Sequence, residues 1–408
     1  MDSCTVPLRH GANRINAERQ NKPLLLLIRD KSRAAPSDEQ WRSIGEALLA
    51  GDPAADRLAA WLVEADQPAR RQVFEQALQQ GITSVPDAPP PLREFFSIVE
   101  TTPPWLDREQ LERGARASAL SGHTGMRVLR DLGLMAGYQA SAINRTLVMT
   151  GALKKGAARR VAETTTWWMN CTAPGGMAKT SSGYRSTVHV RVIHAMVRRQ
   201  LLQHPDWSVS DWGLPVNQLD MQATYLAFSV LFIVGQRALG TLLSKQDAED
   251  IMHLWRYIGW LMGVREDLLC DTLQEGLLAL YQNLLSQAGP DDTSQQLGSA
   301  LMDEPLSRYY PALAQLRGQW EKQVHLSIIR WFVGKRGLES LGLPRHTLPW
   351  YPVLFTPANA LWCGFNRCLP GGKQRLARRG RAAQQRLLHS LFGKTTPAIK
   401  ALPVKSSL

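Results

Sequence analysis

The stretch Asp250–Val264, DIMHLWRYIGWLMGV, decides the fold class of this 408-residue chain. Its large apolar residues recur at spacings of three and four, which is the period of one face of an α-helix. Most of the other patterned stretches in the sequence share this period. Alternating apolar and polar runs that are bounded by tight-turn pairs, the mark of β-hairpins, are missing. The sequence therefore predicts an all-α protein.

Breaks in the helical pattern divide the chain into three segments. We expect residues 1–91 to be an N-terminal helical extension, residues 92–350 to be the main domain, and residues 351–408 to be an aromatic segment with a basic tail. In the N-terminal extension we expect a weakly ordered lead-in at 1–35, two or three helices in 38–82 and a proline-rich connection at 85–91. In the main domain we expect helices through 92–170 broken at 101–105, a glycine- and serine-rich loop at 171–187 and long helices from 188 to 337. Towards the C-terminus we expect an irregular stretch at 344–370, a basic helix at 373–392 and a loose tail at 395–408. The loop at 171–187 suits either a gate or a plain connector.

Composition and charge narrow the class of protein. With 44% hydrophobic and 20% charged residues, the chain has the make-up of a globular protein with a large core. Its net charge of +13 is concentrated at one end, because residues 373–408 hold nine Lys or Arg and no acid. This distribution argues against a fold built around nucleic acid. It fits either peripheral contact with an anionic membrane or a solubilising tail.

Three further features of the sequence concern where in the cell the protein is found. The five cysteines have no repeated spacing, so we expect free thiols in a reducing compartment. The N-terminus lacks the pattern of a secretory signal. The longest uncharged stretch in the middle of the chain, 221–236, is shorter than the roughly 20 residues of a membrane span and predicts a buried helix. Together these features predict a cytoplasmic protein, with surface membrane contact left open.

A histidine in an unusual setting is the first candidate for function. In VHVRVIHAMVRR (188–199), His194 lies on the border between an apolar stripe and a cationic stripe, with Arg191 and Arg198 about 40–60° away on one flank of the helix. A b-type haem needs such surroundings: an imidazole for iron, apolar cover for the ring, and arginines for the propionates. A core histidine bonded to a carbonyl, beside two solvated arginines, is the ordinary alternative.

A second constellation lies upstream in RRVAETTTW (159–167). On a helix Arg160, Glu163, Thr164 and Trp167 share a face. A hydroxyl and a guanidinium one turn apart could hold a small polar ligand such as dioxygen. The ordinary alternative is pairing of Arg160 with Glu163 or Thr164 along the helix.

Taken together, these motifs resemble the MpaB/rubber oxygenase family, which includes the latex-clearing proteins. The resemblance covers roughly residues 92–350. It rests on the order of PPWLD (103–107), Arg160-x-x-Glu163-Thr164, PGG (174–176), Val190-Arg191-x-x-His194-Ala195-x-Val197-Arg198, Asn217-Gln218-x-Asp220 and His253-Leu254-Trp255-Arg256-Tyr257-x-Gly259.

The resemblance implies a globin-like helical core and a haem-b oxygenase that uses O₂ on an unsaturated, hydrophobic, isoprenoid or lipid-like substrate. It implies that His194 is the proximal iron ligand and that Arg160, Glu163 and Thr164 are the catalytic candidates of the distal pocket. The flanking arginines are our own addition as haem propionate partners. A neutral histidine ligand favours dioxygenase chemistry over monooxygenation.

The chain also departs from the latex-clearing pattern. Glu163 stands where some members carry a lysine able to occupy the distal iron position, so the iron should be open or bound by water. The glutamate proposed in those proteins as a catalytic base falls near Asn144 here, beside Arg145. A small or membrane-dissolved substrate is therefore expected in place of polymeric rubber. The competing interpretations are a haem protein with a redox or sensing role, and a helical lipid- or partner-binding protein without a metal.

Two expectations concern the segment 217–236. Asn217 and Asp220 should be the N-cap and a first-turn acid of a helix. Tyr225, Phe228 and Phe232, spaced by three and four, suit either a substrate channel or ordinary core.

Overall fold

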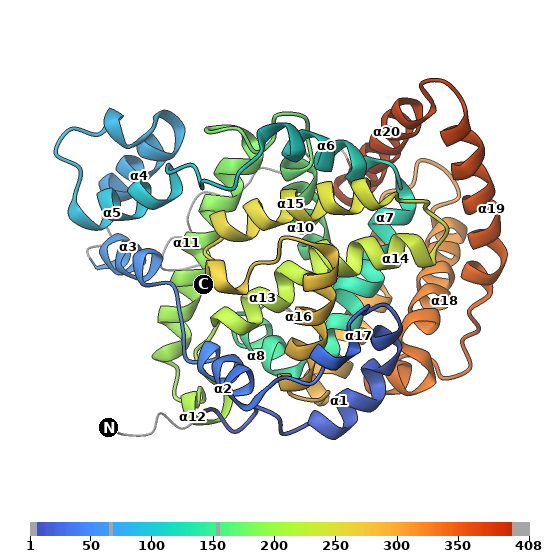
Figure 1. The fold of residues 1–408 in the computed structure, drawn as a ribbon, viewed down its shortest axis with the longest axis horizontal. Helices are drawn as coiled ribbons and strands as arrows, with labels where there is room; N and C mark the ends of the chain where they lie inside the picture. The colour runs from blue at the N-terminus through green and yellow to red at the C-terminus, as the bar shows by residue number, and fades with distance from the viewer. Residues whose placement is uncertain (1–5, 65–67, 152–155, 394–408) are drawn as a thin grey trace.

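The computed structural model describes residues 6–64, 68–151 and 156–393, and these residues form helices joined by turns and loops (Figure 1). No strand occurs in these three ranges. The prediction of an all-α protein is confirmed. One hydrophobic cluster contains residues from the N-terminal extension, the central segment and the C-terminal helices, so all three segments contribute to the same core. The segment boundaries themselves stay a prediction.

The helices have the following bounds. The N-terminal part contains α1 (Arg14–Asn21), α2 (Asp38–Ala47), α3 (Pro53–Val63), α4 (Pro68–Gln80) and α5 (Pro90–Val99). The central part contains α6 (Arg108–Ala119), α7 (His123–Val128), α8 (Ser141–Met149), α10 (Ala157–Cys171), α11 (Ser182–Leu202), α12 (Val209–Trp212), α13 (Gln218–Leu226), α14 (Phe232–Ala238), α15 (Lys245–Leu261), α16 (Leu273–Ser286) and α17 (Asp292–Met302). The C-terminal part contains α18 (Ala314–Ser340), α19 (Trp350–Cys368) and α20 (Gly372–Phe392). Short 3-10 turns connect several of them at 22–26, 31–33, 82–84, 136–139, 266–268 and 304–307.

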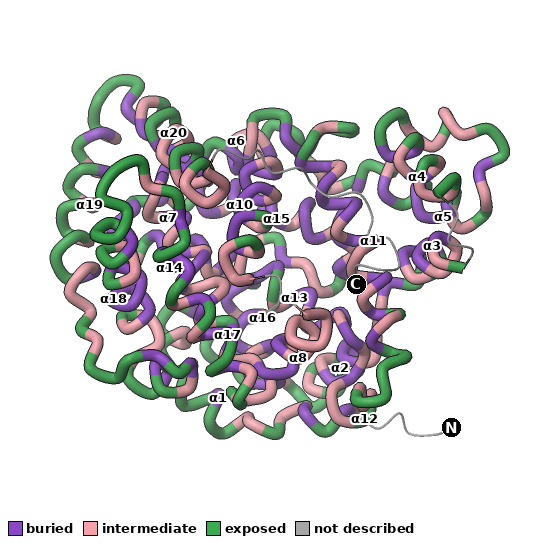
Figure 2. The backbone as a smooth tube through the Cα atoms, turned by 180° about the vertical axis from the view of Figure 1, so that it is seen from behind, coloured by how far each residue is buried: buried purple, intermediate pink, exposed green. Residues whose placement is uncertain are grey.

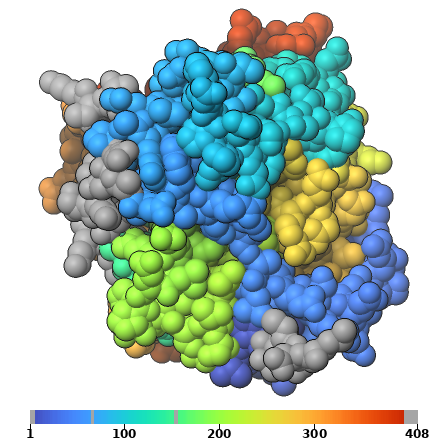
Figure 3. Space-filling model, turned by 90° about the vertical axis from the view of Figure 1, so that its left-hand side faces the viewer, coloured from blue at the N-terminus to red at the C-terminus, as the bar shows by residue number. Residues whose placement is uncertain are grey.

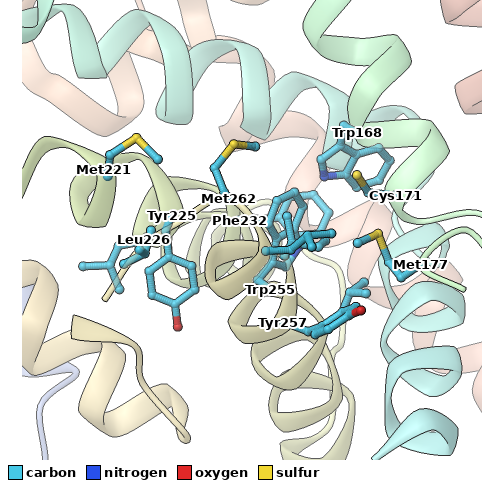
Figure 4. Packing of buried hydrophobic residues seen from close by; sticks show 14 of the residues in the cluster. Trp168, Cys171, Met177, Met221, Tyr225, Leu226, Phe232, Trp255, Tyr257 and Met262 are labelled. Carbon is cyan, nitrogen blue, oxygen red and sulfur yellow. The ribbon is translucent and has the colours of Figure 1, made fainter. Parts of the chain in front are cut away.

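Helix α15 lies at the centre of the fold and packs closely on α6. It begins with a capping box, in which Ser244 and Asp247 each accept a hydrogen bond from the other's backbone N–H. Trp255 and Leu254, on the apolar face predicted from the sequence, are buried. At the contact with α6, a Cβ on Gly114 would lie 2.2 Å from the carbonyl oxygen of Asp250. The backbones of the two helices can approach this closely only because residue 114 has no side chain. Figure 4 shows the buried apolar side chains around α15.

Two segments beside the core wind as π-helix instead of α-helix. They are η4 (Leu129–Met135), which continues α7, and η6 (Ala227–Leu231), which joins α13 to α14. The two segments contact each other. A π turn holds one more residue than an α turn and is often found at functional sites.

The segment 218–238 is the one helical stretch in the described ranges that is long and apolar enough to cross a membrane, and 61% of its most apolar window is buried inside the fold. It packs as a core helix, as predicted from its length. Its N-terminus is capped as expected, because the Asn217 side chain accepts a hydrogen bond of 2.9 Å from the backbone N–H of Asp220.

The N-terminal extension is better ordered than expected. From residue 6 the lead-in is placed, and it includes α1. The buried Arg9 donates a 2.7 Å hydrogen bond to Asp220 and so ties the lead-in to α13. The space-filling view of the end that carries α3, α4 and α5 shows the blue and cyan N-terminal segments spread over that face (Figure 3). The prediction of a weakly ordered lead-in is wrong for this part.

The C-terminal part differs from expectation in one helix. The stretch 344–370, predicted to be irregular, contains the 19-residue helix α19. Pro352 lies in its first turn, where a missing N–H costs nothing, and Pro357 is accommodated inside the helix. The basic helix predicted at 373–392 is confirmed as α20, and the expected tail at 395–408 lies outside the described residues.

Smaller expectations are also resolved. Two or three helices were predicted in 38–82, and the structure has three there, α2, α3 and α4. The loop expected at 171–187 is shorter, because α11 already begins at Ser182. The cysteines in the described ranges, Cys171, Cys270, Cys363 and Cys368, are free thiols.

The Gly114 contact gives a stability prediction. Substitution Gly114→Ala should lower the free energy of unfolding by about 1–3 kcal/mol, because the new methyl group meets backbone that can move only if α6 and α15 separate. Gly137→Ala is the matched control, since a Cβ there has no neighbour within 4 Å. Urea unfolding of the two variants measures the difference. Equal stability of both would contradict the packing described here.

Candidate functional site

A large cavity lies between the central helices. It has a volume of about 650 Å³, within the usual size of small-molecule sites. Side chains from α8, α10, α11, α13, α15, α18 and α20, together with both π segments, line it. The residues that the sequence analysis singled out and that line this cavity are Asn144, Arg160, Glu163, Thr164, Trp167, His194, Tyr225, Phe228 and Trp255. The structure thus brings the histidine of α11 and the Arg-Thr pair of α10 to one cavity.

His194 faces this cavity as a neutral imidazole. Its pKa is lowered to about 4, first because burial disfavours the charged ring and second because Arg198 is nearby. The Nδ1 atom is buried and has no hydrogen-bond partner in the described part of the chain. A buried polar atom without a partner is costly, and because Nδ1 has almost no accessible surface, the cavity can reach only the rest of the ring. The alternative of a core histidine bonded to a carbonyl is therefore not what the structure shows.

Helix α10 presents two polar groups to the same cavity. Arg160 and Thr164, one turn apart, both line it. Arg160 lies over the Tyr138 ring at 5.9 Å, and its Nη1 is buried without a partner in the described ranges. Glu163 is instead paired with Arg159 at 2.9 Å, with both side chains about half exposed at the rim. The alternative pairing of Arg160 with Glu163 is therefore wrong, and the guanidinium group of Arg160 keeps a free donor.

The two arginines that flank His194 do not reach the cavity. Arg191 is buried and forms two hydrogen bonds to the Asp52 carboxylate, at 2.7 and 3.1 Å. Arg198 is also buried; it pairs with Asp56 and donates to the carbonyl of Val216 at 2.8 Å. Neither arginine is among the cavity residues. The expectation that they bind haem propionates is wrong, because carboxylates of α3 already neutralise both groups.

An aromatic wall stands beside these polar groups. Trp167 of α10, Phe228 of η6 and Trp255 of α15 contact one another, with ring centroids 5.0–5.7 Å apart, and all three line the cavity. Phe228 and Trp255 are stacked. Of the three aromatic residues expected at a channel, Tyr225 and Phe228 face the cavity, whereas Phe232 packs on Trp168 in the core. A wall of this kind favours apolar ligands with flat or unsaturated parts.

Asn144 occupies the cavity end of α8. It is fully buried, and its amide Nδ2 donates 2.6 Å to the Tyr138 carbonyl oxygen, which leaves Oδ1 without a partner in the described part of the chain. An amide does not titrate, so this position cannot act as a general base.

The sequence analysis missed a buried charged cluster at another part of the same cavity. Arg130 bonds Asp131 at 2.8 Å and Glu304 at 2.9 Å, and Arg308 bonds Glu304 at 2.7 Å. His325 contacts Asp131 through Nδ1 at 2.7 Å. Burial raises the pKa of Asp131 and lowers that of His325. The one sign of this cluster in the sequence was Asp131, an acid inside the apolar run of η4, because a charge on a buried helix requires a partner.

Comparison with known proteins bears on this arrangement. Residues 122–358 match the family described as "ER-bound oxygenase mpaB/B'/Rubber oxygenase, catalytic domain". The chain belongs to this family. The match contains His194, both polar groups of α10 and the charged cluster. The family is described as one of oxygenases.

Two relatives illustrate the similarity. The chain is 27% identical over 214 residues to a rubber oxygenase from Streptomyces sp. (strain K30), which is 52% of each chain. The chain therefore spans about half the length of this curated relative. The structure entitled "Structure of Latex Clearing Protein LCP in the closed state" has a TM-score of 0.67 and 21% identity, over 87% of this chain and 94% of that one. This likeness supports the fold expected from the resemblance.

The ion pair between α11 and α3 gives a second prediction. Asp52→Asn should lower the free energy of unfolding by about 3–5 kcal/mol, because it leaves the guanidinium charge of Arg191 buried without a counter-charge. The loss should be present in protein without any cofactor. Glu94→Gln is the control, since it removes the partner of Arg57 from an exposed pair, where little stability is at stake. Thermal unfolding that showed no difference between these variants would contradict a structural role for the Arg191 pair.

Proposed function

We propose that the protein is a haem-b-dependent oxygenase that uses O₂ on an unsaturated, isoprenoid or lipid-like molecule of small size. The observation that carries the proposal is the neutral His194 ring, which faces a 650 Å³ aromatic-walled cavity without a protein partner on Nδ1. The neutral imidazole is the form that binds metals. Family membership supports the oxygenase class, and the cavity supports the hydrophobic substrate.

The residues present fit a haem group in their chemistry. His194 would hold the iron, and the apolar and aromatic walls would cover the porphyrin. Arg160 lines the cavity and has no carboxylate partner in the described ranges, whereas Arg127, which also lines it, is already paired with Glu321 at 3.0 Å. Arg160 is therefore better placed than Arg191 and Arg198 to meet a carboxylate of a ligand. Groups of three or more His, Cys, Asp or Glu that could hold a separate metal ion are not found among the described residues.

The chain's own residues would divide the remaining tasks. When bound, haem supplies the activation of dioxygen, which is chemistry of the cofactor. Thr164 can donate a hydrogen bond to a small polar ligand, and the free donor of Arg160 can stabilise negative charge that develops beside it. Trp167, Phe228 and Trp255 keep that part of the cavity poor in water, which strengthens both interactions.

The size and the lining of the cavity favour a small alkene over a polymer. An amide cannot take up a proton, so Asn144 cannot serve as a general base at this part of the cavity wall. Membrane contact, which would supply a lipid-dissolved substrate, is part of the proposal. The basic segment 373–408 was expected to make this contact, but Leu387 and Leu391 of α20 line the cavity and are not free to enter a membrane.

An absorption spectrum tests the proposal. Purified protein reconstituted with haem should show a Soret band that shifts with dithionite and carbon monoxide. His194→Ala should abolish it or weaken haem affinity by at least tenfold. His189→Gln is the matched control on the same helix, because His189 pairs with Glu75 at 2.6 Å, away from the cavity.

Two outcomes would count against the proposal. Folded wild-type protein that remains colourless after reconstitution would favour a helical lipid- or partner-binding protein. A Soret band that survives His194→Ala unchanged would place the iron ligand elsewhere.

A further inference from the structure

Helix α19 turns an apolar face to solvent. The exposed large side chains on it are Val353 (56%), Leu354 (64%), Phe355 (38%), Leu361 (76%), Trp362 (53%) and Phe365 (62%), and Leu369 (38%) follows at its end. In Figure 2 the helix forms a largely green edge of the molecule. Isolated exposed apolar residues are normal on a protein surface, but a contiguous group of this kind marks an interaction site.

The face contains no charged side chain. At 100° per residue, Leu354, Leu361 and Phe365 lie along its middle, and Trp362 and Leu369 lie at one side. Arg367, the one charged residue of α19, points the other way and bonds Asp247 at 3.0 Å. The buried residues Cys363 and Asn366 mark the side that packs on the fold. Because α19 has a packed side and an apolar exposed side, it is suited to lie along a boundary instead of crossing one.

A basic helix runs beside this face. Helix α20 packs on α19 and contains one Lys and five Arg with no acid. Arg379 lies over the ring of Trp362 at 5.7 Å, which places a cation directly at the border of the apolar face. Arg378 and Arg379 are exposed and form no ion pair with a described residue. Exposed aromatic and aliphatic groups bordered by cations match the surface of an anionic bilayer.

We propose that α19 and α20 form a membrane-docking hairpin, in which the apolar face of α19 enters the interface of an anionic bilayer and the arginines of α20 bind lipid headgroups. The same two helices are joined to the cavity. Leu387 and Leu391 of α20 line it, and Tyr351 of α19 accepts a hydrogen bond of 2.5 Å from Arg127, another lining residue. In this arrangement the docked hairpin would place one wall of the cavity next to the lipid. The assignment deepens the membrane contact of the proposed function, but vesicle binding can be measured without haem and without the proposed reaction, so the two can fail separately.

Vesicle flotation of the full-length protein tests the docking hairpin. The protein should bind phosphatidylglycerol–phosphatidylcholine vesicles, bind phosphatidylcholine alone at least tenfold more weakly, and be released in part by salt. The triple variant Leu361→Ser, Trp362→Ser, Phe365→Ser should lose at least tenfold in partitioning, since each removed side chain contributes through its buried apolar area. Arg378→Glu with Arg379→Glu should abolish the preference for anionic lipid.

The chain offers a matched control. Leu8, Ile15 and Leu26 are also well exposed, at 73%, 75% and 78%, but they belong to the N-terminal segment that contains α1, which Figure 1 shows apart from α19. Their triple serine variant should bind vesicles like the wild type. All substituted positions are at the surface, so circular dichroism should show an unchanged fold in each variant.

An environment-sensitive label reports insertion directly. Cys368 is an exposed thiol at the end of α19, whereas Cys363 is buried. A fluorophore on Cys368, in a Cys4→Ser background, should shift to the blue on addition of anionic vesicles.

Three results would overturn the proposal. The first is that the wild-type protein does not bind vesicles, and the second is that the α19 triple variant binds them as well as the wild type does. The third is that the wild-type protein dimerises with increasing concentration without binding vesicles, and that the triple variant does not dimerise. The last result would assign the face to a second copy of the chain.

Discussion

The position of α11 depends on the neutralisation of two buried charges. Arg191 and Arg198 lie on the same side of this helix, and each is held by a carboxylate at the start of α3. Because a guanidinium group cannot stay buried without a counter-charge, these pairs fix how α11 is rotated about its axis. His194, on the border of that side, is thereby turned toward the cavity. An N-terminal helix that touches no ligand thus decides which way the imidazole points.

The helical period made the fold class and many of the helix positions predictable. It also indicated which residues of α10 and α11 share a face. It could not say what lies opposite that face, because an angle on a helical wheel does not identify the neighbouring element. The arginines beside His194 were for this reason assigned to a cofactor, although their partners are Asp52 and Asp56, more than a hundred residues earlier. The role of His194 itself stays a prediction.

Other features could not be predicted from the sequence, for physical reasons. Two prolines and many aromatic residues made the segment of α19 look irregular, yet one proline lies in its first turn and the other is tolerated. The cluster of Arg130, Asp131, Glu304 and Arg308 joins segments that are distant in sequence, so the sequence could indicate that Asp131 needs a partner but not which residues supply it. The lead-in was underestimated because its order comes from contacts with α13 and α16, which local composition does not reveal.

The two π segments have a consequence for how such a cavity can change over evolutionary time. Each holds a residue in excess of regular winding, and both contribute side chains to the cavity wall. Deletion of one residue from η4 or η6 would restore ordinary winding and turn the wall-lining side chains by about 100° relative to those that follow. A single-codon deletion could therefore exchange a whole row of wall residues while both ends of the helix stay in place. Sites of this kind can acquire a new ligand preference in one step instead of through a series of point substitutions.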